Sequence, residues 1–322
     1  MKKRVLHLVR KKAHLKSSFI KNQMSNHLNY SPYHLFRFKK LTLADQRFIE
    51  SDLNTNKENR IEDELDLSAN ESLFEKVYFL LLKKITPFQA KKISSFAIKN
   101  DIDILHFHFG SDAGIYYPFL RKAGLPSIVS FYGYDCSEFP NRYHGLGKLW
   151  LQYRVFRHAS KIIAMSPDMK NDLLKLGCPE EKIVVHHHGN DVHRFYTSER
   201  VFSDKEMVTI LNLCTMVPQK GQMFLLYGIK KLIEKGVTNF TLRIGGAGEL
   251  EQQLKSFVNE NDLSPYVQFL GPLEYGSPEM VREYHEADFF VHPSVIDPLG
   301  CKEGIPGMVG YSSTKAGVIG LV

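Results

Sequence analysis

Two short segments place glycine and lysine where apolar strands give way to helices. Gly246 and Gly248 follow the apolar run at 241–244 and precede a helical pattern that begins near Glu249. Glycines at such a junction let backbone N–H groups at a helix start approach a phosphate. A tight turn without any ligand would need similar glycines, so the spacing alone leaves both interpretations open.

Lys220 occupies a similar position after the apolar run at 208–213. A lysine at the carboxyl end of a strand could neutralise a diphosphate leaving group, much as a metal ion would. An exposed lysine at a turn is the alternative, and the residue type alone does not exclude it.

A third segment, 297–306, follows the apolar run at 289–291. Pro306 suits the first turn of a helix, because the N–H that proline lacks would be unpaired there. Gly304 lets the chain pass close to a ligand. Glu303 would lie just before the helix, where a carboxylate can cap it or accept hydrogen bonds from sugar hydroxyls.

Aromatic and titratable residues end two strands in the first half of the chain, at 106–110 (HFHFG) and 131–135 (FYGYD). Both segments are expected to face a ligand cleft. The histidine triplet at 186–188 suggests a metal. Successive strand residues point to opposite faces, however, so at most two of the three side chains could lie on the same face. Because the four cysteines also form no CxxC pair, the sequence predicts no metal site.

The elements that must position these residues form two series of short apolar runs between amphipathic stretches. This alternation is typical of parallel α/β sheets. A polar linker at 196–207 separates the series, and a polar segment at 54–70 is predicted to be a surface insertion. The expected strands are 4–9, 102–107, 127–131, 161–165 and 183–187, then 208–213, 241–244, 267–270, 289–291 and 318–321.

The sequence therefore predicts an α/β protein of two Rossmann-like, doubly wound domains facing a cleft, with domains at 1–198 and 199–322. Ligands of open α/β sheets bind at the carboxyl ends of the strands, so the cleft is the expected site. The 322 residues, 43% of them hydrophobic and 24% charged, exclude disordered and collagen-like classes. The apolar runs are too short to span a bilayer, and four sparse cysteines suit a reducing, cytoplasmic setting.

The net charge of +7 is concentrated in residues 1–40, which contain many Lys and Arg and no acidic residue. Such a face would attract anionic lipid headgroups, nucleic acid or a phosphorylated ligand, and charge alone does not choose among them. A merely solvated basic surface is an equally good interpretation.

In their order, these segments resemble the retaining glycosyltransferases of family 4, which have the GT-B fold of two Rossmann-like domains. The subgroup that they most resemble comprises the bacterial transferases of colanic acid and other exopolysaccharide or lipopolysaccharide synthesis. The segments are HFHFG at 106–110, FYGYD at 131–135, GNDVHRF at 189–195, VPQKG at 217–221, IGGAGELEQQL at 244–254, VQFLGPL at 267–273 and HPSVIDPLGCKEGIPG at 292–307.

The resemblance implies a nucleoside-diphosphate sugar donor in the second domain and a saccharide or lipid-linked acceptor in the first, at the inner face of a membrane. It implies neither cofactor nor metal, and no nucleic acid partner. Its site residues would be Lys220, Glu303 and Asp135 in catalysis, Gly246, Gly248, Gly304, Ile305 and Pro306 with Lys220 and Glu303 at the donor, and His108, Gly110, Tyr132 and Gly133 on the acceptor side.

The sequence departs from the family's pattern at several positions. An arginine five residues before the lysine falls on Thr215, a histidine of the HG segment falls on Tyr132, and the second glutamate of the E-x7-E motif falls on Tyr311. The chain is also expected to have an incomplete second domain, without the closing helices. A catalytically defective remnant is therefore one alternative. An NAD(P)-dependent oxidoreductase is another, because Tyr311 and Lys315 match a YxxxK segment.

Overall fold

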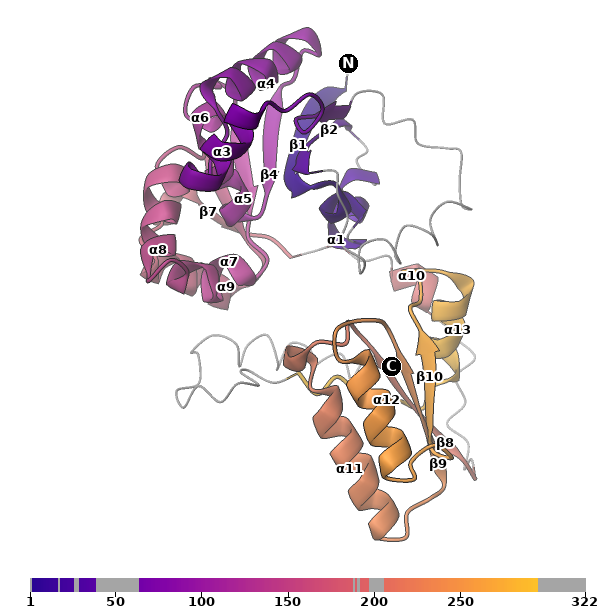
Figure 1. Cartoon of the computed structure of the whole chain (residues 1–322). Coiled ribbons are helices and arrows are strands. Elements are labelled where there is room, and N and C mark those ends of the chain that lie inside the picture. The colour runs from indigo at the N-terminus through magenta and orange to yellow at the C-terminus, as the bar shows by residue number, and fades with distance from the viewer. Residues whose placement is uncertain are drawn as a thin grey trace. The chain divides into compact units, whose positions relative to one another are not determined.

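A computed structural model describes residues 2–16, 18–25, 29–38, 64–187, 189, 192–196 and 206–294, which divide into two compact units (Figure 1). The described residues up to Gly189 belong to the first unit, and those from Val192 onward belong to the second. The predicted domain boundary at 198/199 lies in 197–205, outside the described residues. Helix α10 (Val192–Phe195), before that boundary, packs on α13 (Pro278–Glu286) of the second unit.

The first unit is built on a seven-stranded sheet in which every pairing is parallel, with the order β3-β2-β1-β4-β5-β6-β7. The chain winds outward from β1 in one direction and then from β4 in the other, which makes the sheet doubly wound. Its strands are β1 (Lys3–Lys11), β2 (Tyr30–Phe38), β3 (Glu64–Asp66), β4 (Ile104–His108), β5 (Ser127–Ser130), β6 (Lys161–Ala164) and β7 (Ile183–Val185).

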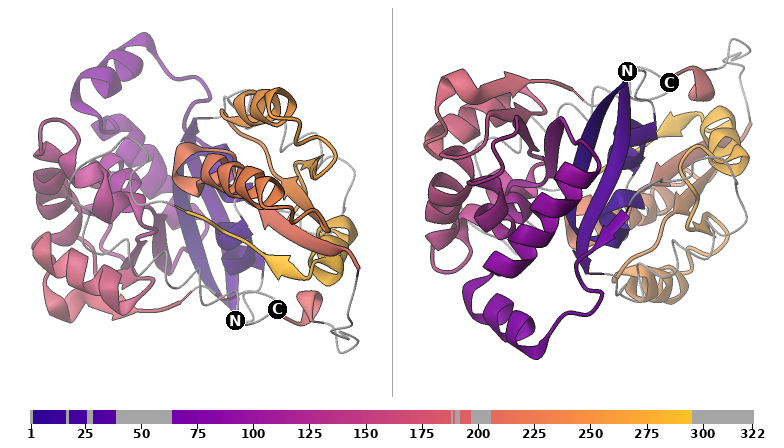
Figure 2. Two further views of the ribbon diagram at one scale, coloured as in Figure 1. Left: turned by 90° about the horizontal axis from the view of Figure 1, so that it is seen from below. Right: turned by 90° about the horizontal axis from the view of Figure 1, so that it is seen from above.

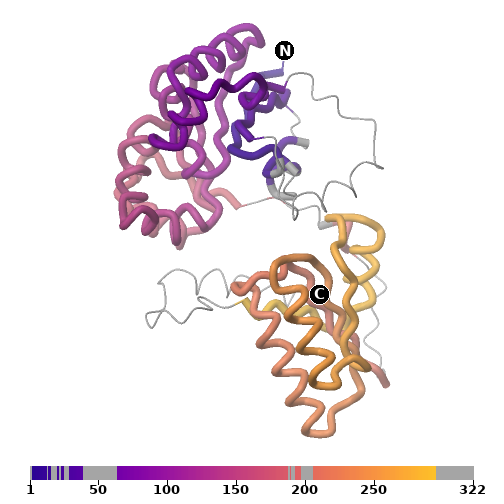
Figure 3. Tube along the Cα trace, in the orientation of Figure 1, coloured from indigo at the N-terminus to yellow at the C-terminus, as the bar shows by residue number. Residues whose placement is uncertain are grey.

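Helices connect these strands, as the continuous trace of the chain shows (Figure 3). They are η1 (Lys12–Lys16), α1 (Ser18–Ser25), α3 (Leu73–Leu82), α4 (Pro87–Lys99), α5 (Gly110–Ile115), α6 (Tyr117–Leu120), α7 (Tyr134–Ser137), η3 (Phe139–Asn141), α8 (Leu146–Leu151), η4 (Gln152–Phe156), α9 (Pro167–Lys175) and η5 (Glu180–Lys182).

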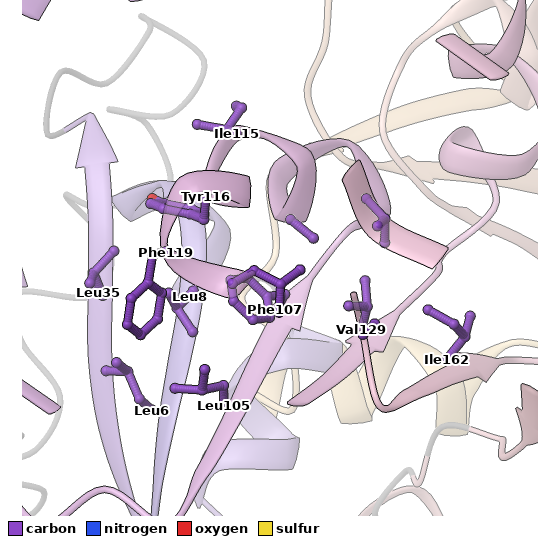
Figure 4. Close-up of a cluster of buried hydrophobic side chains, with 14 of the residues drawn as sticks. Leu6, Leu8, Leu35, Leu105, Phe107, Ile115, Tyr116, Phe119, Val129 and Ile162 are labelled. Carbon is purple, nitrogen blue, oxygen red and sulfur yellow. The ribbon is translucent and has the colours of Figure 1, made fainter. Parts of the chain in front are cut away.

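The two faces of the first sheet carry different side chains. Successive strand residues point to opposite faces, so Leu6 and Leu8 of β1 join Leu105 and Phe107 of β4 in the main core (Figure 4). This core is completed by helical residues such as Phe119, and all five side chains are at most 2% exposed. His7 and His106, which stand between these core residues, point to the other face, as does Val9, which belongs to a smaller apolar cluster.

The second unit has a parallel four-stranded sheet of order β10-β9-β8-β11, also wound in both directions from β8. Its buried core packs α11 and α12 against the two central strands, β8 and β9, which pair in parallel (Figure 2). Its elements are β8 (Val208–Leu213), η6 (Pro218–Lys220), α11 (Gln222–Glu234), β9 (Phe240–Gly245), α12 (Glu251–Glu260), β10 (Val267–Gly271), α13 and β11 (Phe289–Phe290).

Nine of the ten expected strands are confirmed, and the tenth, at 318–321, lies outside the described residues. Two strands were not predicted. One is β2, and the other is β3, which pairs with β2 inside the segment interpreted as a surface insertion. That interpretation is wrong for Glu64–Asp66, because His34, Leu35 and Phe36 hold these residues in the sheet. Residues 54–63 lie outside the described residues.

Two sequence expectations concern the chain's surroundings. Cys136, Cys178 and Cys214 form no disulfide in the part of the chain that the structure describes. Among the described helices, none combines the length and the apolar character needed to cross a bilayer.

Helix α4 offers a matched test of this packing. Ile93 is fully buried in the core, whereas Ile98 on the same helix is 77% exposed. We expect Ile93→Ala to lower the free energy of unfolding by about 2–5 kcal/mol, because a cavity remains. Ile98→Ala should change it by no more than about 0.5 kcal/mol. Urea denaturation of both variants checks this, and equal losses would contradict the assigned orientation of α4.

Candidate functional site

In the first unit, the predicted acceptor-side residues gather where the winding of the sheet reverses. The chain moves from β1 to β2 and β3, then returns to β4 on the other side of β1. Ligands of doubly wound sheets bind at the carboxyl ends of the two strands that flank such a reversal. Those ends are Lys11 of β1 and His108 of β4.

A buried carboxylate joins these two strand ends. Asp112, in the first turn of α5, is 1% exposed, and its Oδ2 accepts a hydrogen bond of 2.8 Å from the backbone N–H of Arg10. The Arg10 side chain lies 3.5 Å from Oδ1, and His14 Nδ1 lies 3.5 Å from Oδ2. Asp112 thus holds the end of β1 and the following turn against α5. Sequence reasoning missed it, although it comes two residues after the HFHFG segment.

Strands β4 and β5 bring His108, Gly110 and Tyr132 together, as expected. His108 Nδ1 lies 2.7 Å from the Tyr132 hydroxyl. A Cβ on Gly110 would collide with the Phe131 ring, so only glycine fits there. Phe109 has φ +74°, a backbone conformation that is strained for a non-glycine residue. Such strain persists only where the surrounding structure imposes it, and it is often found at binding sites.

Asp135, predicted to be catalytic, lies in the short helix α7. That helix starts directly after Gly133, whose φ of +108° favours glycine. Its side chain is fully buried, and Oδ1 accepts a 2.9 Å hydrogen bond from Ser111 N–H. Oδ2 has no hydrogen-bond partner among the described residues. Burial raises the pKa of Asp135 from 3.8 to about 6, although the hydrogen bond from Ser111 opposes the shift. In this structure Asp135 positions α5 rather than meeting solvent.

Four histidines line the face of the first sheet opposite the main core. Sequence reasoning did not predict the contacts that they make. His34, His7 and His106 lie side by side in register on β2, β1 and β4. His7 Nδ1 lies 2.9 Å from His108 Nε2, and His106 Nε2 lies 2.8 Å from Ser130 Oγ. Burial lowers the pKa of His34 to about 4, so this ring is neutral at pH 7.

The sequence analysis expected no metal site, but part of this cluster has suitable geometry. His7, His106 and His108 are buried, and one ligating nitrogen of each lies within 4.8 Å of the others. Histidine nitrogens bind zinc and related metals. These contacts equally suit a hydrogen-bonded chain from the Tyr132 hydroxyl through His108 to His7. The absence of a metal therefore stays a prediction for this chain.

In the second unit the winding reverses between β8 and β11, which places the donor candidates at that edge. Lys220 ends η6 after β8, and Gly221, with φ +69°, directly precedes α11 as its N-cap residue. On the other side of β8, Asn212 Nδ2 donates a 2.7 Å hydrogen bond to the Val291 carbonyl, which fixes the chain after β11. Lys220 therefore lies where a bound nucleotide is expected in such a sheet.

The glycine-rich turn lies beside the loop that carries Lys220. Gly246 has φ +132°, and a Cβ on it would collide with the Cys214 carbonyl oxygen. A Cβ on Gly248 would collide with the Met216 carbonyl oxygen. Met216 N–H also donates a 3.0 Å hydrogen bond to Ala247. Both glycines are thus explained by close backbone packing, and this packing brings the turn and the Lys220 loop to one edge.

Other donor-side positions are only partly described. Thr215, where the family pattern has arginine, is exposed at this edge, and its carbonyl accepts a 3.1 Å hydrogen bond from Gln222 Nε2. The remaining expected donor residues lie outside the described residues, namely Glu303, Gly304, Ile305 and Pro306.

The raised pKa of Asp135 gives a pH-dependent prediction. Because the folded-state pKa of about 6 exceeds the ordinary 3.8, ionised Asp135 lowers stability as the pH rises through this interval. We expect Asp135→Asn to raise the free energy of unfolding at pH 7.5 by about 1–3 kcal/mol, with little effect at pH 4. Urea denaturation at both pH values tests this, with exposed Asp168→Asn as control. An equal gain at both pH values would contradict the assignment.

Sequence comparisons match both halves of the chain to glycosyltransferase families. Residues 63–194 match Glycosyltransferase Family 4, and residues 207–310 match Glycosyl transferases group 1. A putative colanic acid biosynthesis glycosyltransferase, WcaL of Escherichia coli (strain K12), is 30% identical over 210 residues, 63% of this chain and 49% of that protein. The amylovoran biosynthesis glycosyltransferase AmsK of Erwinia amylovora is 29% identical over 64% of this chain and 49% of that protein.

The chain spans about half the length of the curated relatives it matches. Among solved structures, Anabaena Alr3699/HepE has a TM-score of 0.63 with 16% identity, over 92% of this chain and 76% of that one. This similarity shows a common fold, with two parallel α/β units of the GT-B type. The chain thus carries a segment similar to Glycosyltransferase Family 4, followed by a segment similar to the Glycosyl transferases group 1.

Proposed function

We propose that this protein is a retaining glycosyltransferase that moves a sugar from a nucleoside-diphosphate sugar to a saccharide or lipid-linked acceptor in exopolysaccharide or lipopolysaccharide synthesis. The observation that carries the proposal is the common position of Lys220 and the glycine-rich turn at the carboxyl edge of the second sheet, where Lys220 lies next to the reversal of winding. The names of the relatives, which refer to colanic acid and amylovoran, support the polymer class. The Anabaena structure is a complex with UDP and glucose, which supports the donor class.

The donor-side residues suit the departure of a diphosphate. When the bond between the sugar C1 and the diphosphate oxygen breaks, negative charge develops on the leaving group. The acceptor oxygen then bonds to C1, and its proton passes to the departing diphosphate. The Lys220 ammonium would stabilise this charge, and so would the amino-terminal end of α11, which begins at Gln222. Such cationic and dipolar groups would do the work of a metal ion in the proposed reaction.

The acceptor-side residues of the first unit would orient the attacking hydroxyl. Burial raises the pKa of Tyr132 well above its usual value, so its phenol stays protonated at neutral pH. Its hydrogen bond with His108 fixes the ring, and Gly110 and Gly133 keep the surrounding backbone free of side chains. Asp135, which is buried, would act by holding α5 in place rather than by touching the acceptor.

A chain that no longer transfers sugar is the alternative, and one observation favours it. Thr215 offers no cation at an exposed donor-side position where the family pattern has arginine. Failure of the folded chain to bind a nucleoside-diphosphate sugar would support this alternative. The oxidoreductase alternative depends on Tyr311 and Lys315, which lie outside the described residues.

Removal of the Lys220 ammonium tests the donor site. We expect Lys220→Ala to weaken binding of a nucleoside-diphosphate sugar about 10- to 100-fold, as is typical for the loss of a charged hydrogen bond of about 1.5–3 kcal/mol. Titration calorimetry against UDP- and GDP-sugars measures this. The control is Lys235→Ala, because exposed Lys235 follows the far end of the same helix.

Unchanged affinity in a folded Lys220→Ala variant would remove this residue from the donor site. Equal weakening by Lys235→Ala would show that only the general charge of the unit matters.

A further inference from the structure

Helix α3 has its apolar side chains on the outside. Five large apolar residues form one stripe along the helix at the spacing of successive turns, and all are exposed. An ordinary surface helix turns such a stripe toward the core. The exposed fractions are 78% for Leu73, 69% for Phe74, 45% for Val77, 64% for Leu80 and 73% for Leu81.

The inner side of α3 carries the buried Glu75 and the partly buried Phe79, which packs against the main core and Arg37. Arg37 of β2, only 1% exposed, forms a buried ion pair with Glu71 and hydrogen-bonds to Gln89 of α4. Ser72 and Glu75 form a capping box at the start of α3, and Glu75 is 6% exposed. Rotation of α3 to bury its leucines would expose Glu75, break its capping box with Ser72 and remove Phe79 from the core. The outward orientation of the apolar stripe is therefore fixed by the structure.

The apolar surface continues onto the start of α4. A shallow hollow of about 610 Å³ between the two helices is lined by Phe74, Tyr78 and Phe88, and Phe88 is itself 61% exposed. We call the exposed stripe of α3 together with Phe88 the α3–α4 surface. Contiguous exposed apolar patches on soluble proteins mark sites of interaction with proteins, ligands or membranes.

Lysines surround this surface, and almost no acidic group does. Residues 73–99 contain six lysines and a single acidic residue, the buried Glu75. Lys92 Nζ lies 4.7 Å from the centre of the Phe88 ring, and Lys84 Nζ lies 5.9 Å from that of Tyr78. Lysine stems can cover apolar surface while the ammonium groups reach anionic headgroups. Helices with apolar residues on one side and lysines beside them bind in the interface of anionic membranes.

We propose that the α3–α4 surface docks on an anionic lipid membrane. Phe74, Leu81 and Phe88 would enter the boundary between headgroups and acyl chains, and the surrounding lysines would contact lipid phosphates. Two copies of this chain would instead bring their lysines together, so like charges disfavour a second copy as the occupant. The proposal deepens the proposed function, because a lipid-linked acceptor lies at a membrane. Its test uses no donor, so the two can fail separately.

This position differs from the basic face expected in residues 1–40. Several of those cations have acidic partners within the first unit, so they are less able to attract lipid. Arg4 lies 3.0 Å from Asp101, Lys12 lies 2.8 Å from Glu64, Arg10 contacts Asp112 and Arg37 contacts Glu71. The α3–α4 surface combines unneutralised charge with exposed apolar area.

Vesicle sedimentation of the full chain tests the proposal. We expect the chain to bind phosphatidylcholine vesicles that contain phosphatidylglycerol, and to bind pure phosphatidylcholine vesicles at least about tenfold more weakly. The double variant Leu80→Gln/Leu81→Gln should lose most of this binding and keep its fold, because both side chains are exposed. Phe224→Gln on α11, 58% exposed, is the matched apolar control.

Charge reversal provides a second set of variants. Lys76→Glu/Lys91→Glu, at two exposed positions, should weaken binding to the anionic vesicles about tenfold or more. Lys235→Glu in the second unit is its control and should have little effect. The nucleoside-diphosphate sugar affinity of both double variants should match that of the unaltered chain.

Three results would overturn the proposal. Equal binding to neutral and anionic vesicles would remove the role of charge, and full binding by Leu80→Gln/Leu81→Gln would remove the apolar stripe. Self-association that this variant abolishes, without vesicle binding by the unaltered chain, would show that a second copy occupies the surface.

Discussion

Parallel pairing of every strand is the constraint on which both candidate sites depend. It brings all carboxyl ends of a sheet to one edge, and the winding reverses beside β1 in the first unit and beside β8 in the second. In the first unit, buried Asp112 binds the turn after β1 to α5 and so fixes the position of that turn. In the second, backbone contacts between Met216 and the glycine-rich turn place Lys220 beside that turn.

Polar networks in the first unit set the position of elements more than they supply chemistry. Asp135 holds α5 through the hydrogen bond from Ser111. The histidines of β2, β1 and β4 link these three strands on the face opposite the main core. The buried pair of Arg37 and Glu71 fixes the segment just before α3, and the apolar stripe of α3 stays exposed. A buried ion pair is costly to desolvate, so its value here lies in fixing one position of that segment.

The sequence predicts well what local patterns encode. The β-branched runs located nine strands, and glycine spacing located the turn after β9. Strand β2 was missed because Tyr30–Phe38 contains proline and basic and aromatic residues rather than an alternating apolar pattern. The histidine cluster and the exposed stripe of α3 depend on register between strands and on contacts with Arg37, which no local pattern contains. The glycines were predicted as phosphate contacts or a turn. Their contacts with Cys214 and Met216 account for the turn, and the phosphate contact stays a prediction.

Amide hydrogen exchange of the full chain, with and without a nucleoside-diphosphate sugar, tests the central claim that donor binds at the carboxyl edge of the second sheet. We expect the donor to slow exchange in the loops 214–221 and 246–250, which follow β8 and β9 at that edge. The loops at the opposite edge, 235–239 and 261–266, should keep their rates. Slower exchange at the opposite edge alone, under saturating donor, would contradict the account.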